Sequence, residues 1–208
     1  ISAVSGYPNG KQFYEDCLKF HTTTSMTPEE IHQLGLDEVT RVRSEMESIA
    51  ADAGYEGRLQ EYLEHLRTSK EFEPESADAL CALFRDITGT ISPAMLKLFP
   101  LKTLPRMPFL ITETPAAHAS MAPAAYYLAG SANPRAPRPG TFYVNTSELH
   151  TRRTYECEAL ALHEAIPGHH YQISLTQENE NLPEFRKTLW YSAYGEGWAL
   201  YTENLGKE

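Results

Sequence analysis

The sequence predicts a mainly α-helical fold that carries one small antiparallel β ribbon. Three observations point to it: helical periodicity with capping signals over residues 1–100, proline-rich stretches with two short β-type runs over 101–150, and a return of the helical pattern over 151–208. The shares of hydrophobic (41%) and charged (22%) residues are those of ordinary globular proteins. We therefore expect one domain in three parts: a helical scaffold, a ribbon segment and a final group of helices.

The first clear helix signal is the tetrapeptide Thr27-Pro28-Glu29-Glu30. It combines a capping hydroxyl, a proline where no amide hydrogen is needed and a glutamate at the capping-box position. Apolar residues then recur at steps of three to five positions and stop near Gly54, so we expect a packed amphipathic helix. The expected buried stripe consists of Ile31, Leu34, Val39, Val42, Met46 and Ile49.

Three more helices are expected before residue 101. One covers Leu59 to Leu66, and a second begins at Ser76, after which apolar residues recur at helical spacing. A third, short helix is expected to start at Ser92-Pro93 and to stop at Pro100, because proline cannot continue a helix ladder. No motif that carries chemistry is recognisable in this half of the chain.

Two runs in the proline-rich segment favour β-strands, namely Ala125–Leu128 and Thr141–Val144. They could pair across the loop 129–140 as a small antiparallel ribbon, although this loop is longer than a tight hairpin turn. Their aromatic pairs, Tyr126-Tyr127 and Phe142-Tyr143, either form an edge to which a peptide adds as an extra strand or pack in the core.

Charge and cysteine usage exclude several classes of function. A net charge of -10 without a basic stripe argues against a nucleic-acid partner, and no run approaches the ~18 apolar residues of a membrane span. The three cysteines, Cys17, Cys81 and Cys157, lack CxxC spacing, so we expect buried free thiols. The chain starts at Ile1 and ends at Glu208 within a helical pattern, so we expect it to be part of a longer protein. The residues do not indicate an oligomeric state.

The chemistry of the chain is concentrated in the segment from His163 to His170. Imidazole nitrogen is a preferred zinc ligand, and three protein ligands with one open position make a catalytic zinc site. Glu164 directly follows His163, so its carboxylate projects beside the imidazole, where it could take a proton from a metal-activated water. His163 and Glu164 therefore match the opening of the HExxH zinc motif.

The second half of that motif is altered. Position i+4 from His163 holds Pro167. On an unbroken helix, His169 would be rotated by ~120° from His163, and His170 would lie ~10 Å further along the axis. Pro167 and Gly168 predict a helix break that loops out two residues and returns His169 to one-turn register with His163. His170 is the alternative second ligand.

A third metal ligand is expected from the last segment of the chain. Glu196 lies 32 positions after Glu164. Gly195 and Gly197 flank it, and their lack of side-chain bulk would permit close approach to the metal-binding helix. Glu203 lies two turns further along the same helix face, so its carboxylate could orient a ligand histidine without binding the metal itself.

A hydrolytic site also needs a donor for the developing oxyanion, and a tyrosine or histidine is the usual supplier. Tyr194 and His170 are the residues we expect to serve the reaction together with Glu164. Tyr191 and Tyr201 are further candidates, and the spacing does not rank them.

These residues resemble the family of the domain of unknown function numbered 885, a group of predicted zinc peptidases marked by HExxPGHHxQ followed by EGWALYxE. In this sequence the two motifs stand at residues 163–172 and 196–203, and the upstream segment 139–146 is similar to the family as well. The likeness is most specific over residues 126–205.

The resemblance implies a helical metallopeptidase-like fold, similar to the thermostable carboxypeptidase and oligopeptidase group, with the ribbon placed before the metal-binding helix. It implies a gluzincin-like site in which Zn²⁺ is held by His163, His169 and Glu196, because Gly168-His169 aligns with the Gly-His of those relatives. The implied function is hydrolysis of peptide bonds in short peptide substrates, with Glu164 as general base for the metal-activated water.

Two alternatives stay open at this point. The same ligands could serve a metal-dependent hydrolase of another amide or of an ester, since they determine water activation and not the acyl group. The chain could also be a helical module with a structural metal, in which His170 joins His169 as a closing fourth ligand. The compartment is not fixed by the residues, and an extracytoplasmic or secreted location is the expectation.

Overall fold

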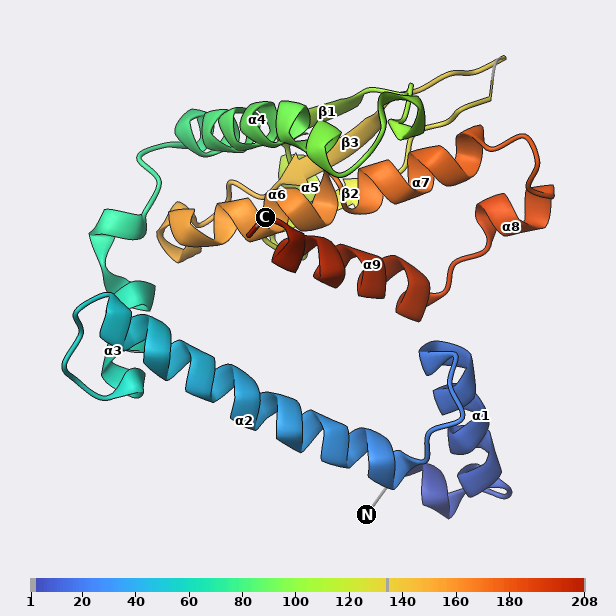
Figure 1. The fold of residues 1–208 in the computed structure, drawn as a ribbon, viewed down its shortest axis with the longest axis horizontal. Helices are drawn as coiled ribbons and strands as arrows, with labels where there is room; N and C mark the ends of the chain where they lie inside the picture. The colour runs from blue at the N-terminus through green and yellow to red at the C-terminus, as the bar shows by residue number, and fades with distance from the viewer. Residues whose placement is uncertain (1–2, 134, 208) are drawn as a thin grey trace. The chain divides into compact units, whose positions relative to one another are not determined.

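The computed structural model describes residues 3–133 and 135–207, and this part of the chain is mainly helical with one small sheet, as the sequence predicts (Figure 1). Its α-helices are α1 (Gly10–Thr22), α2 (Pro28–Asp52), α3 (Leu59–Thr68), α4 (Ala77–Ala94), α5 (Ala116–Ala119), α6 (Cys157–Glu164), α7 (His169–Glu178), α8 (Glu184–Thr188) and α9 (Ser192–Leu205). Its strands are β1 (Phe109–Glu113), β2 (Ala125–Leu128) and β3 (Gly140–Val144).

The chain divides into two compact units. The first consists of Ile1–Ser69 with Tyr191–Ala193 and contains α1, α2 and α3. The second consists of Lys70–Trp190 with Tyr194–Glu208 and contains the sheet and the helices from α4 onward, including most of α9. All residues singled out above for chemistry, except Tyr191, lie in the second unit.

Helix α2 begins at the predicted capping box. The Thr27 hydroxyl accepts a hydrogen bond from the backbone amide of Glu30 (3.2 Å), and the Glu30 carboxylate accepts one from the amide of Thr27 (2.7 Å). These two bonds satisfy amides that the first turn of a helix leaves without partners. The start of this helix is therefore fixed by local sequence, and the prediction is confirmed.

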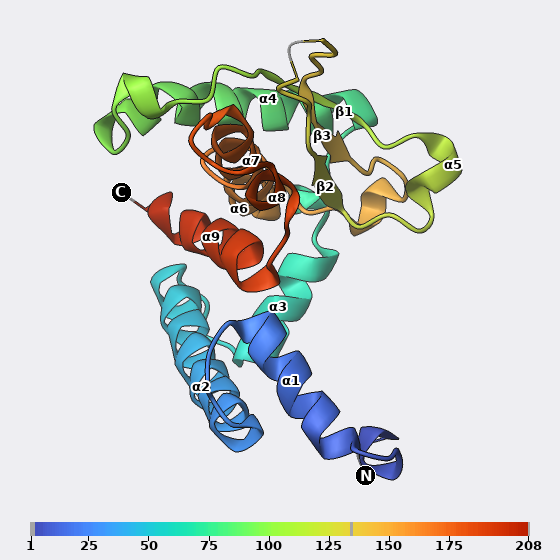
Figure 2. The same cartoon turned by 90° about the vertical axis from the view of Figure 1, so that its right-hand side faces the viewer.

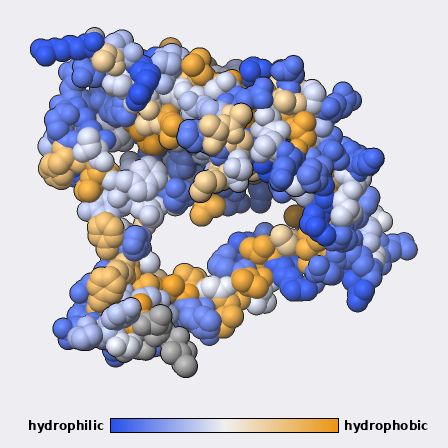
Figure 3. All heavy atoms as spheres, turned by 180° about the vertical axis from the view of Figure 1, so that it is seen from behind, coloured by the Kyte–Doolittle hydropathy of each residue, from blue (hydrophilic) through white to orange (hydrophobic). Residues whose placement is uncertain are grey.

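The predicted burial of the α2 stripe is wrong for the first unit. Val39 and Ile49 are 65% and 60% exposed, and apolar side chains gather along α2 on the molecular surface (Figure 3). Helix α3 packs beside α2 and leaves a groove of about 360 Å³ between them, lined in part by Met46 and Leu63. Periodicity predicted the helix correctly. An apolar stripe is buried only where another element packs against it.

Helix α4 begins at the expected cap, where the Ser76 hydroxyl accepts from the amide of Ala79 (3.0 Å). The prediction of a separate helix starting at Ser92-Pro93 is wrong, because α4 continues through Pro93 to Ala94. The fixed backbone angle of proline is compatible with a helix, and near the last turn its missing amide costs a single hydrogen bond. A short 3-10 turn, Met95–Lys97, follows.

The sheet has the strand order β1-β3-β2. Strands β2 and β3 are antiparallel, with Ala125 opposite Val144 and Leu128 opposite Thr141, so the predicted ribbon is confirmed. Sequence reasoning missed β1, which pairs with β3 in parallel from Phe109 opposite Gly140. As a result β3 is the central strand, and its Phe142 and Val144 are fully buried.

The core of the second unit lies where α4, the sheet and α6 meet. Phe84 of α4 contacts Phe142 of β3 edge to face, with ring centroids 4.9 Å apart. The thiols of Cys81 and Cys157 are free and buried in the same core, as expected, while Cys17 is only partly buried. Helices α6 and α7 run between α9 on one side and α4 with the sheet on the other (Figures 1 and 2).

None of the helices in the described ranges combines the length and the apolar character that crossing a lipid bilayer requires.

Candidate metal centre

The chain bends between α6 and α7 at the place that the sequence predicts. The amide of Tyr171 bonds to the carbonyl of Ala165 (3.4 Å), six residues back instead of the four of a regular helix, so two residues are looped out. Ile166 and Pro167 are joined by a cis peptide bond. Gly168 has no room for a side chain, because a Cβ atom there would overlap the carbonyl oxygens of His163 and Leu162.

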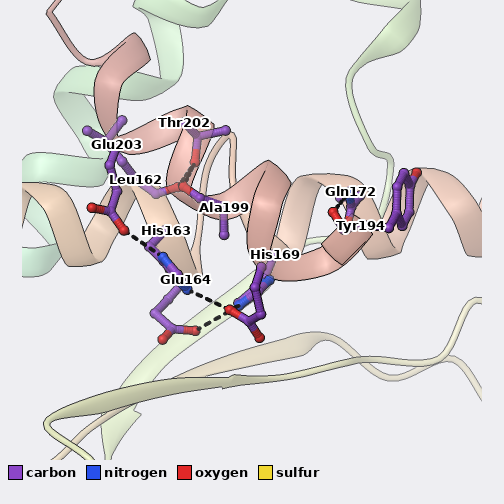
Figure 4. A network of polar contacts seen from close by, with 10 residues as sticks. Leu162, His163, Glu164, His169, Gln172, Tyr194, Ala199, Thr202 and Glu203 are labelled. Atoms are coloured by element: carbon purple, nitrogen blue, oxygen red, sulfur yellow. Dashed lines mark hydrogen bonds and ion pairs between the residues drawn. The ribbon is translucent and has the colours of Figure 1, made fainter. Parts of the chain in front are cut away.

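The bend brings two imidazoles together at the end of α6 and the start of α7. The rings of His163 and His169 lie 4.7 Å apart between centroids and are nearly perpendicular (88°) (Figure 4). From α9, the Glu196 carboxylate reaches both, with its Oε2 3.3 Å from His163 Nε2 and 3.5 Å from His169 Nε2. Glu164 points to the same place, and its Oε2 lies 4.0 Å from His169 Nε2.

These separations fit a tetrahedral metal ion. Nitrogen and oxygen ligands about 2.0–2.1 Å from zinc stand roughly 3.3 Å apart in a tetrahedron, close to the two distances from Glu196 to the imidazoles. Potential ligand atoms of His163, Glu164 and His169 also lie within 4.8 Å of one another, so this group could hold a metal ion. Of the two carboxylates, that of Glu196 is the nearer to His169.

Glu203 makes the contact that its spacing on α9 predicts. Its Oε1 lies 2.7 Å from Nδ1 of His163, one side of the ring, while Nε2 faces Glu196. A hydrogen bond from Nδ1 to this carboxylate leaves the Nε2 lone pair available for a metal, as in ligand histidines generally. Nδ1 of His169, by contrast, is buried without a partner among the described residues.

Burial controls the protonation of the two groups at the bend. It raises the pKa of Glu164, although the neighbouring His163 and a hydrogen bond from the backbone amide of Tyr127 act against this rise. Burial lowers the pKa of His169, with Glu196 opposing the change. A neutral imidazole has a lone pair to offer a metal, and a carboxylate with a raised pKa accepts a proton more readily than an ordinary glutamate does.

His170 lies apart from this cluster. Its side chain is 2% exposed, its Nδ1 is 2.9 Å from the Tyr127 hydroxyl and 3.3 Å from that of Ser174, and its ring packs against Phe109 (4.7 Å). Burial lowers the pKa of His170 to about 4. The second histidine of the pair therefore holds α7 against the sheet, whereas His169 faces His163.

The tyrosines considered as oxyanion donors lie in different surroundings. Tyr194 accepts a hydrogen bond at its backbone carbonyl from Gln172 (3.1 Å), and its ring lies beside Gln172, away from the two imidazoles (Figure 4). Tyr201 is exposed and packs on Trp198 at 5.7 Å. Tyr191 contacts Phe20 within the first unit. The geometry therefore does not bring Tyr194 to the cluster.

The glycines beside Glu196 have a different role from the one expected. A Cβ on Gly195 would overlap the indole of Trp190, and one on Gly197 would meet no atom within 4 Å. Gly195 thus makes space for Trp190, whose ring in turn lies edge-on to His169 at 5.7 Å. Sequence reasoning missed Trp190 as a wall of the site, because the loop before α9 carries no spacing signal.

The comparisons with known proteins agree with this architecture. Residues 2–208 match the family described as "Bacterial protein of unknown function (DUF885)". The chain belongs to the DUF885 family. The motifs HExxPGHHxQ and EGWALYxE of the family thus correspond to the α6–α7 bend and to the middle of α9.

Among solved structures, a protein of Colwellia psychrerythraea described as a putative lipoprotein is 31% identical, with a TM-score of 0.85. The similarity covers 98% of this chain and 35% of the other, so the chain spans about a third of that protein's length. No curated protein matches the sequence.

Proposed function

We propose that this DUF885 chain carries the zinc centre of a metallopeptidase, with His163, His169 and Glu196 as ligands and Glu164 as general base. The observation that carries the proposal is the convergence of both Nε2 atoms on one Glu196 oxygen, at 3.3 and 3.5 Å, with the Glu164 carboxylate alongside. Two imidazoles, one carboxylate and an open position are the donor set of hydrolytic zinc sites.

The protein side chains have distinct tasks in this proposal. A bound zinc ion would supply Lewis acidity, which lowers the pKa of a coordinated water and polarises a carbonyl group. Glu164 takes the proton from the attacking water at its carboxylate and delivers it to the leaving amine. Glu203 holds His163 in the tautomer that a ligand needs.

A peptide substrate is supported by the position of β2. This strand pairs with β3 on one side only and is an edge of the described sheet, and α6, which ends at Glu164, lies against it. An extended peptide bound along such an edge would lie beside the general base. The central position of β3 excludes Phe142-Tyr143 from that role. We also propose an extracytoplasmic location, in keeping with the lipoprotein description of the Colwellia psychrerythraea protein.

The test uses the full-length protein with a panel of short peptides and, in parallel, model esters and non-peptide amides. We expect the wild-type protein to contain about one zinc per chain and to release amino acids from peptides. Glu164→Gln should retain zinc and lose at least about 100-fold in kcat/KM, because general acid–base catalysis typically contributes 10²–10⁴-fold. His163→Ala and Glu196→Ala should lose both zinc and activity.

Three outcomes would contradict the proposal. Full activity of Glu164→Gln would remove the general base, and zinc retained by His163→Ala would remove the metal centre. Turnover of esters or non-peptide amides without turnover of any peptide would assign the same centre to another hydrolase.

A further inference from the structure

Interrupting α6 leaves backbone carbonyl groups at the bend that need new partners. In a regular helix, the carbonyl of Leu162 would accept from the amide of Ile166, and that of His163 would face residue 167, which is a proline and has no amide hydrogen. Buried carbonyls without a partner are costly, so the bend can persist only if other groups donate to it.

Two side chains of α9 donate hydrogen bonds to carbonyls of this region, those of Pro167 and Leu162. The indole Nε1 of Trp198 donates to the carbonyl of Pro167 at 2.7 Å. The Thr202 hydroxyl is completely buried, and its one hydrogen is shared between the carbonyl of Leu162 (2.9 Å) and that of Ala199 in its own helix (2.7 Å). Pro167 belongs to the bend between the two imidazoles. Leu162 belongs to the turn before it, where Figure 4 shows Thr202 beside it.

The two donors define how α9 sits on the bend. Trp198 and Thr202 are four residues apart, so they lie on one helix face. Ala199, also completely buried, lies between this face and the one that carries Glu196 and Glu203. A rotation of α9, or a slide along its axis, would break both hydrogen bonds and would also move Glu196 away from the imidazoles.

Packing around Trp198 adds ring contacts to the two hydrogen bonds. Its ring stacks on Tyr171 of α7 at 6.4 Å (14° between planes) and contacts Phe99 at 6.5 Å. The indole thus packs between α7 and the segment after α4, and a shift of α9 would disturb these contacts together with the hydrogen bond to Pro167.

We infer that Trp198 and Thr202 are positioning residues of the metal centre, which set the register of α9 against the α6–α7 bend so that Glu196 meets His163 and His169. They touch neither the ion nor a substrate and act through Glu196. The inference rests on the proposed zinc centre, but it does not depend on the reaction that the centre catalyses.

The test measures metal binding to the full-length protein, with Zn²⁺ affinity from competition with a chelator and Co²⁺ absorption as a signature of coordination. Thr202→Val removes the hydroxyl at nearly constant volume, and Trp198→Phe removes the indole N–H. We expect each to weaken zinc binding by about 10-fold or more, the usual effect of residues that orient ligands. Each should also weaken the Co²⁺ absorption bands.

Two matched variants separate positioning from folding. Thr202→Ser keeps the hydroxyl and should bind zinc within about threefold of wild type. Thr176→Val makes the same chemical change on α7, where the hydroxyl, among the described residues, bonds to its own helix at Gln172 (2.8 Å). This variant should leave zinc affinity and the Co²⁺ spectrum unchanged. Its thermal midpoint serves as the reference for a purely structural loss.

The possible results distinguish this inference from the proposed function. Unchanged zinc affinity in Thr202→Val and Trp198→Phe, with only a lowered thermal midpoint, would overturn the inference alone. Absence of zinc binding by the wild-type protein would overturn both. Weakened zinc binding in these two variants of a protein that cleaves no peptide would support the inference and refute the peptidase.

Discussion

Glu178, the last residue of α7, shows how one carboxylate can order a loop. It accepts hydrogen bonds from the backbone amides of Arg106 and Met107, both at 2.9 Å, and from the Arg106 guanidinium at 3.1 Å. Burial by itself would raise the pKa of Glu178, but these hydrogen bonds outweigh it and the pKa is lowered. The segment that leads into β1 is thereby tied to the end of α7.

Glu178→Gln should lower the free energy of unfolding by about 1–3 kcal/mol at pH 7, since it removes hydrogen bonds to a charged acceptor. A folded-state pKa below the unfolded value near 4.5 means that the stabilisation is present above that pH and is lost as pH falls below it. The difference between wild type and variant should therefore shrink between about pH 5 and pH 3 in urea unfolding.

Glu180→Gln is the matched control, because it makes the same change at an exposed site two residues on, and it should have almost no effect. If the difference in unfolding free energy between wild type and Glu178→Gln stayed constant down to pH 3, the charge of Glu178 would not be the stabilising element.

Two neighbouring histidines illustrate the limit of sequence reasoning at this scale. The spacing from His163 left both His169 and His170 as possible ligands, because the rotation of the chain after a break is set by long-range contacts. In the structure, His169 turns toward His163, and His170 meets Tyr127 of β2. The deciding partner of His170 is 43 positions away, so no local pattern could identify it.

At the scale of elements, the bend between α6 and α7 is sensitive to substitution. Gly168→Ala would place a methyl group on the carbonyl oxygens of Leu162 and His163, which cannot retreat without disrupting the last turn of α6. We expect a loss of at least about 2 kcal/mol in unfolding free energy and of about 10-fold or more in zinc affinity. Denaturant unfolding and chelator competition measure the two effects.

Gly89→Ala provides the comparison within a regular helix. A Cβ there has no neighbour within 4 Å, and alanine is the better helix former. The free energy of unfolding should therefore rise by up to about 1 kcal/mol. If Gly168→Ala lost no more unfolding free energy and zinc affinity than Gly89→Ala, the bend would tolerate a side chain and Gly168 would not be required for it.

The elements that sequence reasoning predicted are those with local signals. The starts of α2 and α4 follow from Thr27 and Ser76, whose side chains cap the helices, and the β2–β3 ribbon follows from β-type residues around a single loop. The same reasoning split α4 at Pro93, because it gave the proline more weight than the surrounding helix. It missed β1, a strand whose parallel partner lies beyond a crossover.

At the scale of the whole molecule, an ion would join three elements that are separate in sequence. Its ligands would come from the end of α6, the start of α7 and the second turn of α9, so binding would stabilise the folded form of the second unit. At a zinc concentration about 100-fold above Kd, the gain is roughly 2.7 kcal/mol. We expect a chelator to lower the thermal midpoint of wild type and added zinc to restore it.

His163→Ala should unfold at the same temperature with and without zinc, since it has lost a ligand. If neither chelator nor added zinc changed the thermal midpoint of the wild-type protein, the proposed linkage between the ion and the fold would be contradicted.

At this scale, composition and periodicity predicted the helix α2 but not the burial of its apolar stripe. The sequence predicted that Val39, Ile49 and their neighbours would be covered, yet within the first unit they are exposed. Periodicity shows which face of a helix is apolar, whereas burial depends on contacts between elements far apart in the sequence.

The two looped-out residues also affect how such sites can be found in other genomes. A search that demands a fixed interval between two histidines passes over this chain, because the interval here is six positions instead of four. A pattern that allows a short insertion containing proline and glycine, and that asks for a tryptophan and a threonine on the partner helix, would collect the relatives that share the bend.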